Sequence, residues 1–577
     1  MGLNFKGWKK NWSLMSAFFN AEEIRTITDR LKHLTAEHIV FCSFENRFAR
    51  SGGLATVITN ILPYLKELNT VQSVILLTPF YPHIMDGKKL RPTGIKFNVQ
   101  FSGKPVRAEL YEYTWSYTSP LKGSIKEYYI GARGFFEASN SLKDPYIYIE
   151  KSKEQNNKAL CRNALFYCKA VPSALGALGI RKNIIFHLHE WQTAFVSLTS
   201  KEAMLNRVLI SGATVQTMHN SYDSQISWKE LKSILTRPRR PSLARISEQS
   251  LSAYQIGLQL VDAPLTTVSE NFAKELTTDI IQTKHYAPHL QNILKANKTF
   301  GINNGMFVDF SPEFPKKDKH TLSEIKNVKL KNRKALLEIL DCYHPKERFG
   351  ELTYREKSII KLPDNVPIVV MTGRLDPIQK GYFVLLRSIE KFARDKIKFI
   401  LAPLPVNPAH LDYFYEIACK CRGNVTVFPL RMIKGYRELQ TGSTFGVMPS
   451  IYEPFGAAVE YMASGTVVIG RATGGLVDQI DNTCGFLFKE DAVFYKPENI
   501  RDFIDSGTIM QANKINTWAQ SMADNLSLTL KKASEIYQNH PSQYYRLIQE
   551  SFKKASRFDW RKAAKKYFQV YNMVNNK

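Results

Sequence analysis

Short apolar runs alternate with amphipathic stretches along the chain, and this alternation predicts a parallel sheet in its first half. The run 38–44 is typical of a buried strand, and the stretch after it places Leu54, Val57 and Ile61 on one helical face. Further buried runs of the first half are 73–79, 184–189, 213–220 and 264–269. Strand–helix units in series put helices on both faces of a parallel sheet.

The same pattern restarts after a charged, mostly helical stretch. The apolar runs of the second half are 366–375, 397–404, 424–430, 444–450 and 466–472. We therefore predict an α/β protein with two Rossmann-like, doubly wound domains and a cleft between them. The predicted divisions are an N-terminal extension (1–36), a first domain (37–318), a charged helical linker (319–364), a second domain (365–545) and a C-terminal helix (546–577).

Composition places the chain among globular proteins. Its 577 residues exceed what one core usually holds, and hydrophobic residues make up 44%. We find no apolar run of the length that spans a membrane, and the first residues lack the features of a secretory signal. The seven cysteines are scattered, which is typical of reduced thiols. These observations predict a cytoplasmic protein without a membrane span.

The formal net charge of +27 is unusual. Basic residues gather at Arg237–Arg240, from Lys316 to Lys334, and in the last predicted helix. Such a field attracts polyanions, so an acidic or polyanionic partner is one prediction. Solvated basic faces without a partner are the alternative.

Four motifs carry candidate chemistry, and the first is Arg50-Ser-Gly-Gly-Leu54. It follows a predicted strand and opens a predicted helix. Glycines let the backbone approach a ligand closely, and a helix N-terminus offers N–H groups to phosphate. A tight structural turn is the alternative interpretation.

The second motif, His187-Leu-His-Glu-Trp-Gln192, ends a predicted strand, which is where ligands bind in open α/β sheets. Histidine at this edge can hydrogen-bond a sugar hydroxyl while tryptophan shapes the pocket. Alternation along a strand also puts His187 and His189 on one face, as a metal site requires. No third ligand is evident, so we favour sugar contact over metal.

The third and fourth motifs lie in the second half of the chain. In the third, Arg374 and Lys380 share one loop after a strand, where a guanidinium and an ammonium can clamp a diphosphate. The fourth comprises Pro449-Ser-Ile-Tyr-Glu-Pro-Phe-Gly456 with Glu460 and, further on, Arg471-Ala-Thr-Gly-Gly-Leu476. A carboxylate on a tight turn beside a helix N-terminus and a second glycine turn predict a nucleotide-sugar site.

Together these motifs resemble the glycogen/starch synthase family, which shows them in the same order. Three further segments add to the resemblance: Thr217-Met-His-Asn220, Thr267-Val-Ser269 and Gly301-Ile-Asn-Asn-Gly305. A closing Trp560-Arg-Lys-Ala-Ala-Lys-Lys-Tyr567 helix completes it, so the resemblance runs from about 38 to 572. It implies a GT-B fold whose C-terminal helix crosses back to the first domain. It also implies a retaining hexosyltransferase that needs no metal or other cofactor.

The resemblance also implies roles for individual residues. Those implied in catalysis are His189, Arg374, Lys380 and Glu453. Those implied in donor or nucleotide binding are Arg50, Gly52, Gly53, Asn304, Tyr452, Phe455, Gly456, Glu460, Thr473, Gly474, Gly475 and Leu476. Those implied on the acceptor side or in the pocket are Trp191, His219 and Asn220. The expected reaction transfers glucose from UDP- or ADP-glucose to the non-reducing end of an α-1,4-glucan, and the Arg374–Lys380 spacing favours UDP.

Some positions depart from the family pattern. Arg50 replaces a lysine, Thr56 replaces a frequent acidic residue, and Ala402-Pro-Leu-Pro405 replaces a glycine-rich donor loop. Glu453 and Glu460 stand seven residues apart instead of eight. Two alternatives therefore stay open: a related transferase with a protein, lipid or other glycan acceptor, and a catalytically weak regulatory or binding protein on the same scaffold.

Overall fold

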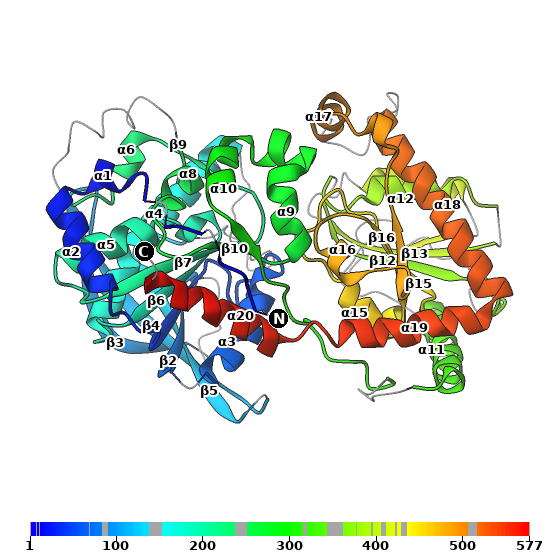
Figure 1. The fold of residues 1–577 in the computed structure, drawn as a ribbon. Coiled ribbons are helices and arrows are strands. Elements are labelled where there is room, and N and C mark those ends of the chain that lie inside the picture. Colours follow the sequence, from blue (N-terminus) through cyan, green and yellow to red (C-terminus); the bar gives the residue numbers. More distant parts are fainter. Residues whose placement is uncertain are drawn as a thin grey trace.

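The structure is a computed structural model of the whole chain. It describes residues 2–575 except 7, 11, 69, 83–89, 120, 138–152, 237–250, 315–319, 343–361, 377, 394–395, 406–410, 422–423, 429–434 and 506–515. The basic cluster Arg237–Arg240 and the start of the Lys316–Lys334 stretch lie outside the described residues. The described residues form two α/β lobes (Figure 1).

The N-terminal lobe is built on a nine-stranded sheet of order β11-β10-β7-β6-β1-β2-β5-β4-β3. Its strands are β1 (His38–Cys42), β2 (Ser73–Pro79), β3 (Arg91–Phe101), β4 (Lys104–Tyr117), β5 (Gly123–Ala132), β6 (Ile184–His189), β7 (Gly212–Met218), β10 (Leu265–Thr267) and β11 (Thr299–Gly301). A small separate sheet pairs β8 (Gln225–Ile226) with β9 (Leu251–Ser252). The strands from β11 to β5 run parallel, so their carboxyl ends share one edge.

One edge of this sheet departs from the predicted pattern. Strands β3 and β4 join it antiparallel, through the pairs β3–β4 and β4–β5. The sequence interpretation assigned no strands there. Residues on β3 alternate between exposed and partly buried positions, the period-two pattern of a sheet edge that faces water on one side.

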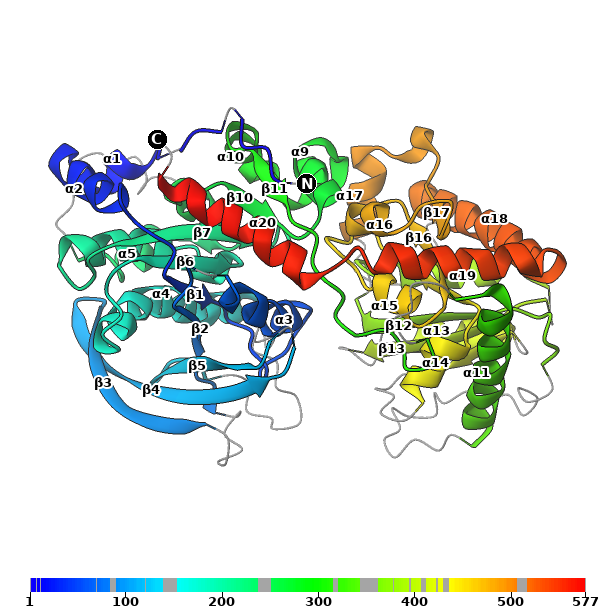
Figure 2. The same ribbon diagram turned by 60° about the horizontal axis from the view of Figure 1, so that its bottom comes forward.

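Helices cover both faces of the N-terminal sheet (Figures 1 and 2). They are α1 (Met15–Phe18), α2 (Ala21–Leu31), α3 (Leu54–Lys66), α4 (Lys153–Ala177), α5 (Val196–Leu205), α6 (Trp228–Leu231), α8 (Ala253–Gly257), α9 (Glu270–Thr278) and α10 (Gln291–Ala296). The face of α3 that the sequence predicted to be apolar is buried, including Leu54, Val57 and Ile61.

The C-terminal lobe is built on a six-stranded sheet of order β14-β13-β12-β15-β16-β17, whose described pairs are all parallel. Its strands are β12 (Ile368–Leu375), β13 (Lys398–Pro405), β14 (Val425–Val427), β15 (Phe445–Met448), β16 (Val467–Arg471) and β17 (Gly485–Phe488). Its helices are α11 (Leu322–Cys342), α12 (Tyr382–Ile389), α13 (Asp412–Lys420), α14 (Tyr436–Gly442), α15 (Ala458–Ala463), α16 (Gly474–Gln479), α17 (Pro497–Asp505), α18 (Thr517–Asn539) and α19 (Pro541–Ala555).

The last helix joins the two lobes. Helix α19 packs against the C-terminal lobe, and the chain then crosses to α20 (Trp560–Asn572), which lies on the N-terminal lobe beside α3 (Figure 2). Trp560, Tyr567 and Tyr571 are buried in the N-terminal core. The two doubly wound sheets and this crossing helix confirm the predicted fold class.

Candidate active site

A cavity of about 520 Å³ lies between the lobes, at the carboxyl ends of their parallel strands. This is the edge at which ligands bind in open α/β sheets. The sequence-predicted residues that line it are Gly52, Gly53, Trp191, His219, Asn220, Asn304, Arg374, Lys380, Glu453, Phe455 and Gly456. The predicted residues that do not line it are Arg50, His189, Tyr452, Glu460, Thr473, Gly474, Gly475 and Leu476. Most of the predicted residues therefore meet in one place.

The C-terminal wall of the cavity carries a basic loop and a carboxylate. Lys380 Nζ lies 2.7 Å from Glu453 Oε2, which also accepts a hydrogen bond of 3.0 Å from Ser450 Oγ. Arg374 lies near the end of β12, just before this loop, and donates to Gln379 Oε1 at 3.3 Å. The Arg374 side chain is 36% exposed and that of Lys380 26%, so both cations remain accessible to a ligand.

A glycine brings this loop against the Glu453 turn. Gly381 has φ of 68°, and a Cβ added there would lie 1.9 Å from the carbonyl oxygen of Pro449. Only glycine fits both the left-handed conformation and the close approach. The contact places Lys380 beside Glu453, although the two are 73 residues apart in sequence.

The second glycine turn, at Gly474 and Gly475, packs against the backbone of Glu453. Gly475 N donates to the carbonyl oxygen of Glu453 at 2.9 Å, and a Cβ at Gly474 would lie 1.8 Å from that oxygen. Leu476 is fully buried. This turn therefore holds the backbone of Glu453 in position.

The turn also joins the lobes. Glu275 of α9 accepts hydrogen bonds from Gly474 N at 2.7 Å and Thr473 Oγ1 at 3.3 Å, and Asn271 Nδ2 donates to the Gly474 carbonyl at 3.2 Å. Burial raises the pKa of Glu275 to about 7. In this arrangement Thr473 and Gly474 bind a protein carboxylate.

Tyr452 and Glu460, which the sequence predicted to bind the nucleotide-sugar donor, contact residues of the cavity wall without lining the cavity themselves. Tyr452 is buried, hydrogen-bonds the hydroxyl of Tyr222, and packs its ring 4.7 Å from that of Tyr286. Burial raises the pKa of Glu460 to about 7, while the charge of Lys380 lowers it. Lys380 therefore interacts with two carboxylates.

The Gly52–Gly53 turn is partly occupied by the protein itself. Its N–H groups were expected to be available to phosphate, and those of Ser51 and Gly52 instead donate to a carboxylate of the chain. Glu45 Oε2 accepts hydrogen bonds from the backbone nitrogens of Ser51 at 3.2 Å and Gly52 at 3.0 Å. Arg50 is exposed and does not line the cavity, and its Nε donates to the carbonyl of Arg47 at 3.1 Å.

Three histidines with neighbouring rings lie at the N-terminal wall of the cavity. His187 Nδ1 is 2.8 Å from Tyr571 Oη on α20, and the rings of His187 and His189 are 4.2 Å apart. His189 Nδ1 lies 2.9 Å from His219 Nε2, and of the two only His219 lines the cavity. These three histidines therefore connect α20 to the cavity.

Burial keeps these histidines neutral. It lowers the pKa values of His187 and His189 well below the ordinary range and that of His219 to about 3. A neutral imidazole can both donate and accept a hydrogen bond, as contact with a sugar hydroxyl requires.

The sequence interpretation missed two carboxylates in the same wall. Glu190 sits in the quoted histidine motif but received no role, and Glu45 was not singled out at all. Glu190 has φ of 65°, a rare value for a residue with a side chain, and its carboxylate accepts from His219 N at 2.7 Å. Burial raises the pKa of Glu190 to about 8, and the nearby charge of Glu45 adds to the shift. The left-handed backbone conformation of Glu190 could not be predicted from its sequence.

A pH-dependent stability follows from His219. Its pKa of about 3 in the folded chain lies below the ordinary histidine value of about 6.5, so below pH 6.5 only the unfolded chain gains this proton. Stability should fall as pH falls, and between pH 6.5 and 5 the loss from this group is roughly 1.5 kcal/mol. We expect urea unfolding to show a steeper loss in the wild type than in His219→Gln; parallel slopes would contradict the buried neutral state.

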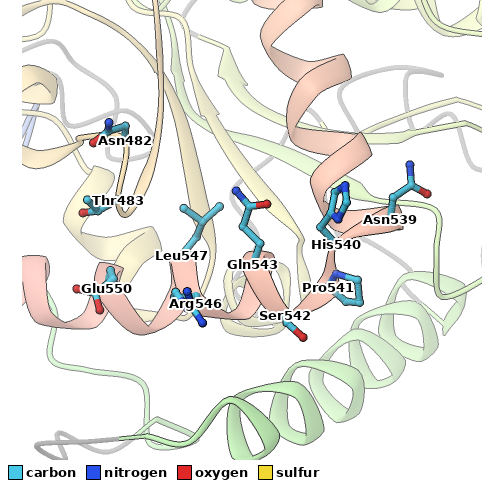
Figure 3. A pocket seen from close by; sticks show the side chains of 10 residues that line it. All are labelled: Asn482, Thr483, Asn539, His540, Pro541, Ser542, Gln543, Arg546, Leu547 and Glu550. Atoms are coloured by element: carbon cyan, nitrogen blue, oxygen red, sulfur yellow. The ribbon is translucent and has the colours of Figure 1, made fainter.

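A second hollow, of about 840 Å³, lies on the C-terminal lobe alone, where α18 meets α19 (Figure 3). Its walls include Asn482, His540, Gln543 and Arg546. None of the sequence-predicted site residues lines it. The cavity between the lobes is therefore the candidate active site.

Across the part of the chain that the structure describes, no group of three or more His, Cys, Asp or Glu side chains is placed to hold a metal ion. Among the described helices, none is both long and apolar enough to span a bilayer.

The two facing sheets and the basic loop at their shared cavity define a glycosyltransferase of the GT-B class. Residues 38–296 match the family described as "Starch synthase catalytic domain", and residues 354–520 match "Glycosyl transferases group 1". Residues 38–296 therefore belong to the starch synthase catalytic-domain family, and the chain as a whole is similar to glycogen synthases.

Individual relatives agree along nearly the full length. The glycogen synthase of Petrotoga mobilis is 25% identical over 555 residues, covering 93% of this chain and 99% of that protein. The glycogen synthase of Aliivibrio fischeri is 26% identical over 561 residues, covering 93% and 98%. The solved catalytic domain of starch synthase IV from Arabidopsis thaliana, bound to ADP and acarbose, superposes with a TM-score of 0.66 at 21% identity, covering 94% of this chain and 100% of that one.

Proposed function

We propose that this enzyme transfers glucose, with retention of configuration, from a nucleotide-glucose donor to the non-reducing end of an α-1,4-glucan. The observation that carries the proposal is the Arg374–Lys380 loop beside Glu453 in the cavity between the lobes. Relatives named glycogen synthase, matched over 93% of the chain, support the glucan as acceptor.

The basic loop suits the leaving group. A nucleoside diphosphate gains negative charge as the bond to glucose breaks, and preorganised cations in a water-poor cavity stabilise that charge. Arg374 offers a planar fork of donors and Lys380 a compact charge. Because Lys380 is paired with Glu453 at 2.7 Å, its ammonium is held in place before the donor arrives.

The N-terminal wall of the cavity offers groups that can bind the sugars. His219 and Trp191 line it, and His219 is neutral, so it can exchange hydrogen bonds with hydroxyl groups without adding charge. We assign His189 a positioning role through its 2.9 Å contact with His219, because His189 itself lies behind the wall.

Nucleotide release tests the proposal. We expect glycogen or maltooligosaccharides to accelerate release of nucleotide from UDP-glucose or ADP-glucose, and the faster donor identifies the base that the site accepts. The six-residue separation of Arg374 and Lys380 resembles that of archaeal and eukaryotic members of the family, which commonly use UDP-glucose, so we expect UDP-glucose to be faster. Release that ignores every glucan but responds to a protein or lipid extract would contradict the glucan acceptor.

The same assay, run with EDTA, tests whether the reaction needs a metal ion. Arg374 and Lys380 already supply two positive charges at the cavity, so turnover is expected to survive EDTA. An absolute requirement for a divalent ion would contradict the assignment of the leaving-group charge to these two side chains.

The polyanionic partner and the cytoplasmic location stay predictions. On α19, Lys553 lies 2.6 Å from Glu550, and Lys554 lies 2.8 Å from Asp481, so part of the basic charge is paired within the chain.

A further inference from the structure

A series of buried hydrogen bonds runs from α20 into the N-terminal sheet. Tyr571 Oη lies 2.8 Å from His187 Nδ1, and His187 Nε2 lies 2.7 Å from Thr217 Oγ1. Thr217 Oγ1 lies 2.6 Å from Thr266 Oγ1, which lies 3.1 Å from the carbonyl oxygen of Gln216. The four side chains of the series are at most 1% exposed, so bulk water does not replace a lost partner.

The carbonyl at the end of the series fixes the direction of every hydrogen bond in it. A carbonyl oxygen only accepts, so the one hydroxyl hydrogen of Thr266 points to Gln216, and Thr217 must donate to Thr266. His187 Nε2 must then donate to Thr217, because the Thr217 hydrogen is already engaged. Burial keeps the His187 imidazole neutral by lowering its pKa well below the ordinary range, so its Nδ1 carries no hydrogen and accepts from Tyr571. The Tyr571 hydroxyl therefore holds His187 in the form that carries its hydrogen at Nε2.

The ring of His187 supports the histidines of the site. Its centroid lies 4.2 Å from that of His189, which also packs at 4.8 Å against Phe41. His189 Nδ1 lies 2.9 Å from His219 Nε2, and His219 lines the cavity. His189 Nε2 has no hydrogen-bond partner among the described residues. Ring packing and one hydrogen bond to His219 therefore set the orientation of the His189 ring, and in a close-packed interior a shift of His187 is passed on to both.

We infer that Tyr571 is a positioning residue for the transfer reaction, acting through His187 on the pair formed by His189 and His219. The inference rests on the proposed function and adds a residue that does not itself line the cavity. Tyr571 touches no reacting group, and its hydroxyl fixes the ring against which His189 packs. Because α20 follows directly from the C-terminal lobe, the segment that joins the lobes also sets the geometry of the N-terminal wall (Figure 2).

Tyr571→Phe tests the inference. The substitution keeps the aromatic ring and removes only the hydroxyl, which leaves His187 Nδ1 as a buried acceptor without a donor. The His187 ring is then held by one hydrogen bond in place of two. We expect kcat for transfer to maltooligosaccharide to fall roughly tenfold, because small displacements of site groups act on the transition state. The KM values for the nucleotide sugar and for the glucan should stay within about twofold.

Tyr544→Phe is the matched control. Tyr544 is equally buried, lies on α19, and donates from its Oη to the carbonyl oxygen of Thr444 at 3.0 Å, within the C-terminal lobe. Each variant loses one buried hydrogen bond, so the two melting temperatures should fall by similar amounts. Only Tyr571→Phe should lose turnover.

The ring nitrogens give a readout that does not depend on turnover. Nuclear magnetic resonance of protein labelled with nitrogen-15 in its histidines distinguishes ring nitrogens that carry a hydrogen from those that do not. We expect His187 of the wild type to carry its hydrogen at Nε2. The ring signals of His187, His189 and His219 should shift in Tyr571→Phe. They should stay in place in Tyr544→Phe.

Several outcomes would overturn the inference. Unchanged kcat in folded Tyr571→Phe is one, and an equal loss of kcat in Tyr544→Phe is another. Unchanged His189 and His219 signals in Tyr571→Phe would overturn it whatever the rate. If the wild type transfers glucose to no glucan, the proposed function fails on its own, and the ring signals then decide the inference: a shift of the His189 and His219 signals in Tyr571→Phe sustains the positioning by Tyr571, and no shift overturns it.

Discussion

Replacing Lys380 or Arg374 by alanine is expected to lower turnover by a few hundredfold. Loss of one preorganised contact to a developing negative charge costs about 3–4 kcal/mol. Lys380→Ala also leaves Glu453, a buried carboxylate, without its 2.7 Å cationic partner. Steady-state nucleotide release at saturating donor and glucan measures the effect, because the interaction strengthens in the transition state and therefore acts on kcat.

The control for this prediction is a lysine in an ion pair on the same lobe. Lys420 pairs with Glu390, but its side chain is 68% exposed, and exposed pairs contribute about 0–1 kcal/mol. Lys420→Ala should turn over at the wild-type rate. Near-normal turnover in a folded Arg374→Ala/Lys380→Ala double variant would refute the role of the basic loop.

Lys201→Met is expected to destabilise the chain by about 3–5 kcal/mol, because it leaves a buried charge unpaired. Lys201 Nζ lies 2.9 Å from Asp262 Oδ2 and 2.7 Å from the carbonyl of Leu260, and both side chains of the pair are fully buried. Asp262 Oδ2 also accepts from Thr214 N at 2.8 Å. Urea unfolding followed by circular dichroism measures the free energy of unfolding.

Two further variants separate the pair from a general loss of charge. Lys201→Met with Asp262→Asn should recover a large part of the loss, since no unpaired ion remains. Lys32 pairs with Asp29 on the exposed surface, so Lys32→Met should change the free energy of unfolding by less than about 1 kcal/mol. A Lys201→Met variant as stable as Lys32→Met would contradict the buried pair.

The local pattern of apolar and polar residues was enough to predict the central strands and the motifs that follow them. The predicted strands 73–79 and 184–189 match β2 (Ser73–Pro79) and β6 (Ile184–His189) residue for residue. A buried parallel strand is a continuous apolar run bounded by turn residues, so its signal is local. The C-terminal wall was predicted for the same reason, because Arg374 and Lys380 lie near the end of one strand and in the loop after it.

The antiparallel edge was harder to predict. Strands β3 (Arg91–Phe101) and β4 (Lys104–Tyr117) are half exposed, so their sequences hold few apolar residues in a row. Their place in the sheet depends on the pairing of β4 with β5 and of β3 with β4. The sequence of one strand alone does not specify its pairing partner.

By itself the sequence determined the two parallel sheets, the residues of the basic loop and the family resemblance that they carry. Only the tertiary structure decided which groups occupy the glycine turns. Glu45 reaches the Gly52 turn from the loop before it, and Glu275 reaches Gly474 from 199 residues away in the other lobe. Backbone N–H groups at a helix start donate to whichever carboxylate the fold brings within reach, and that choice depends on long-range packing.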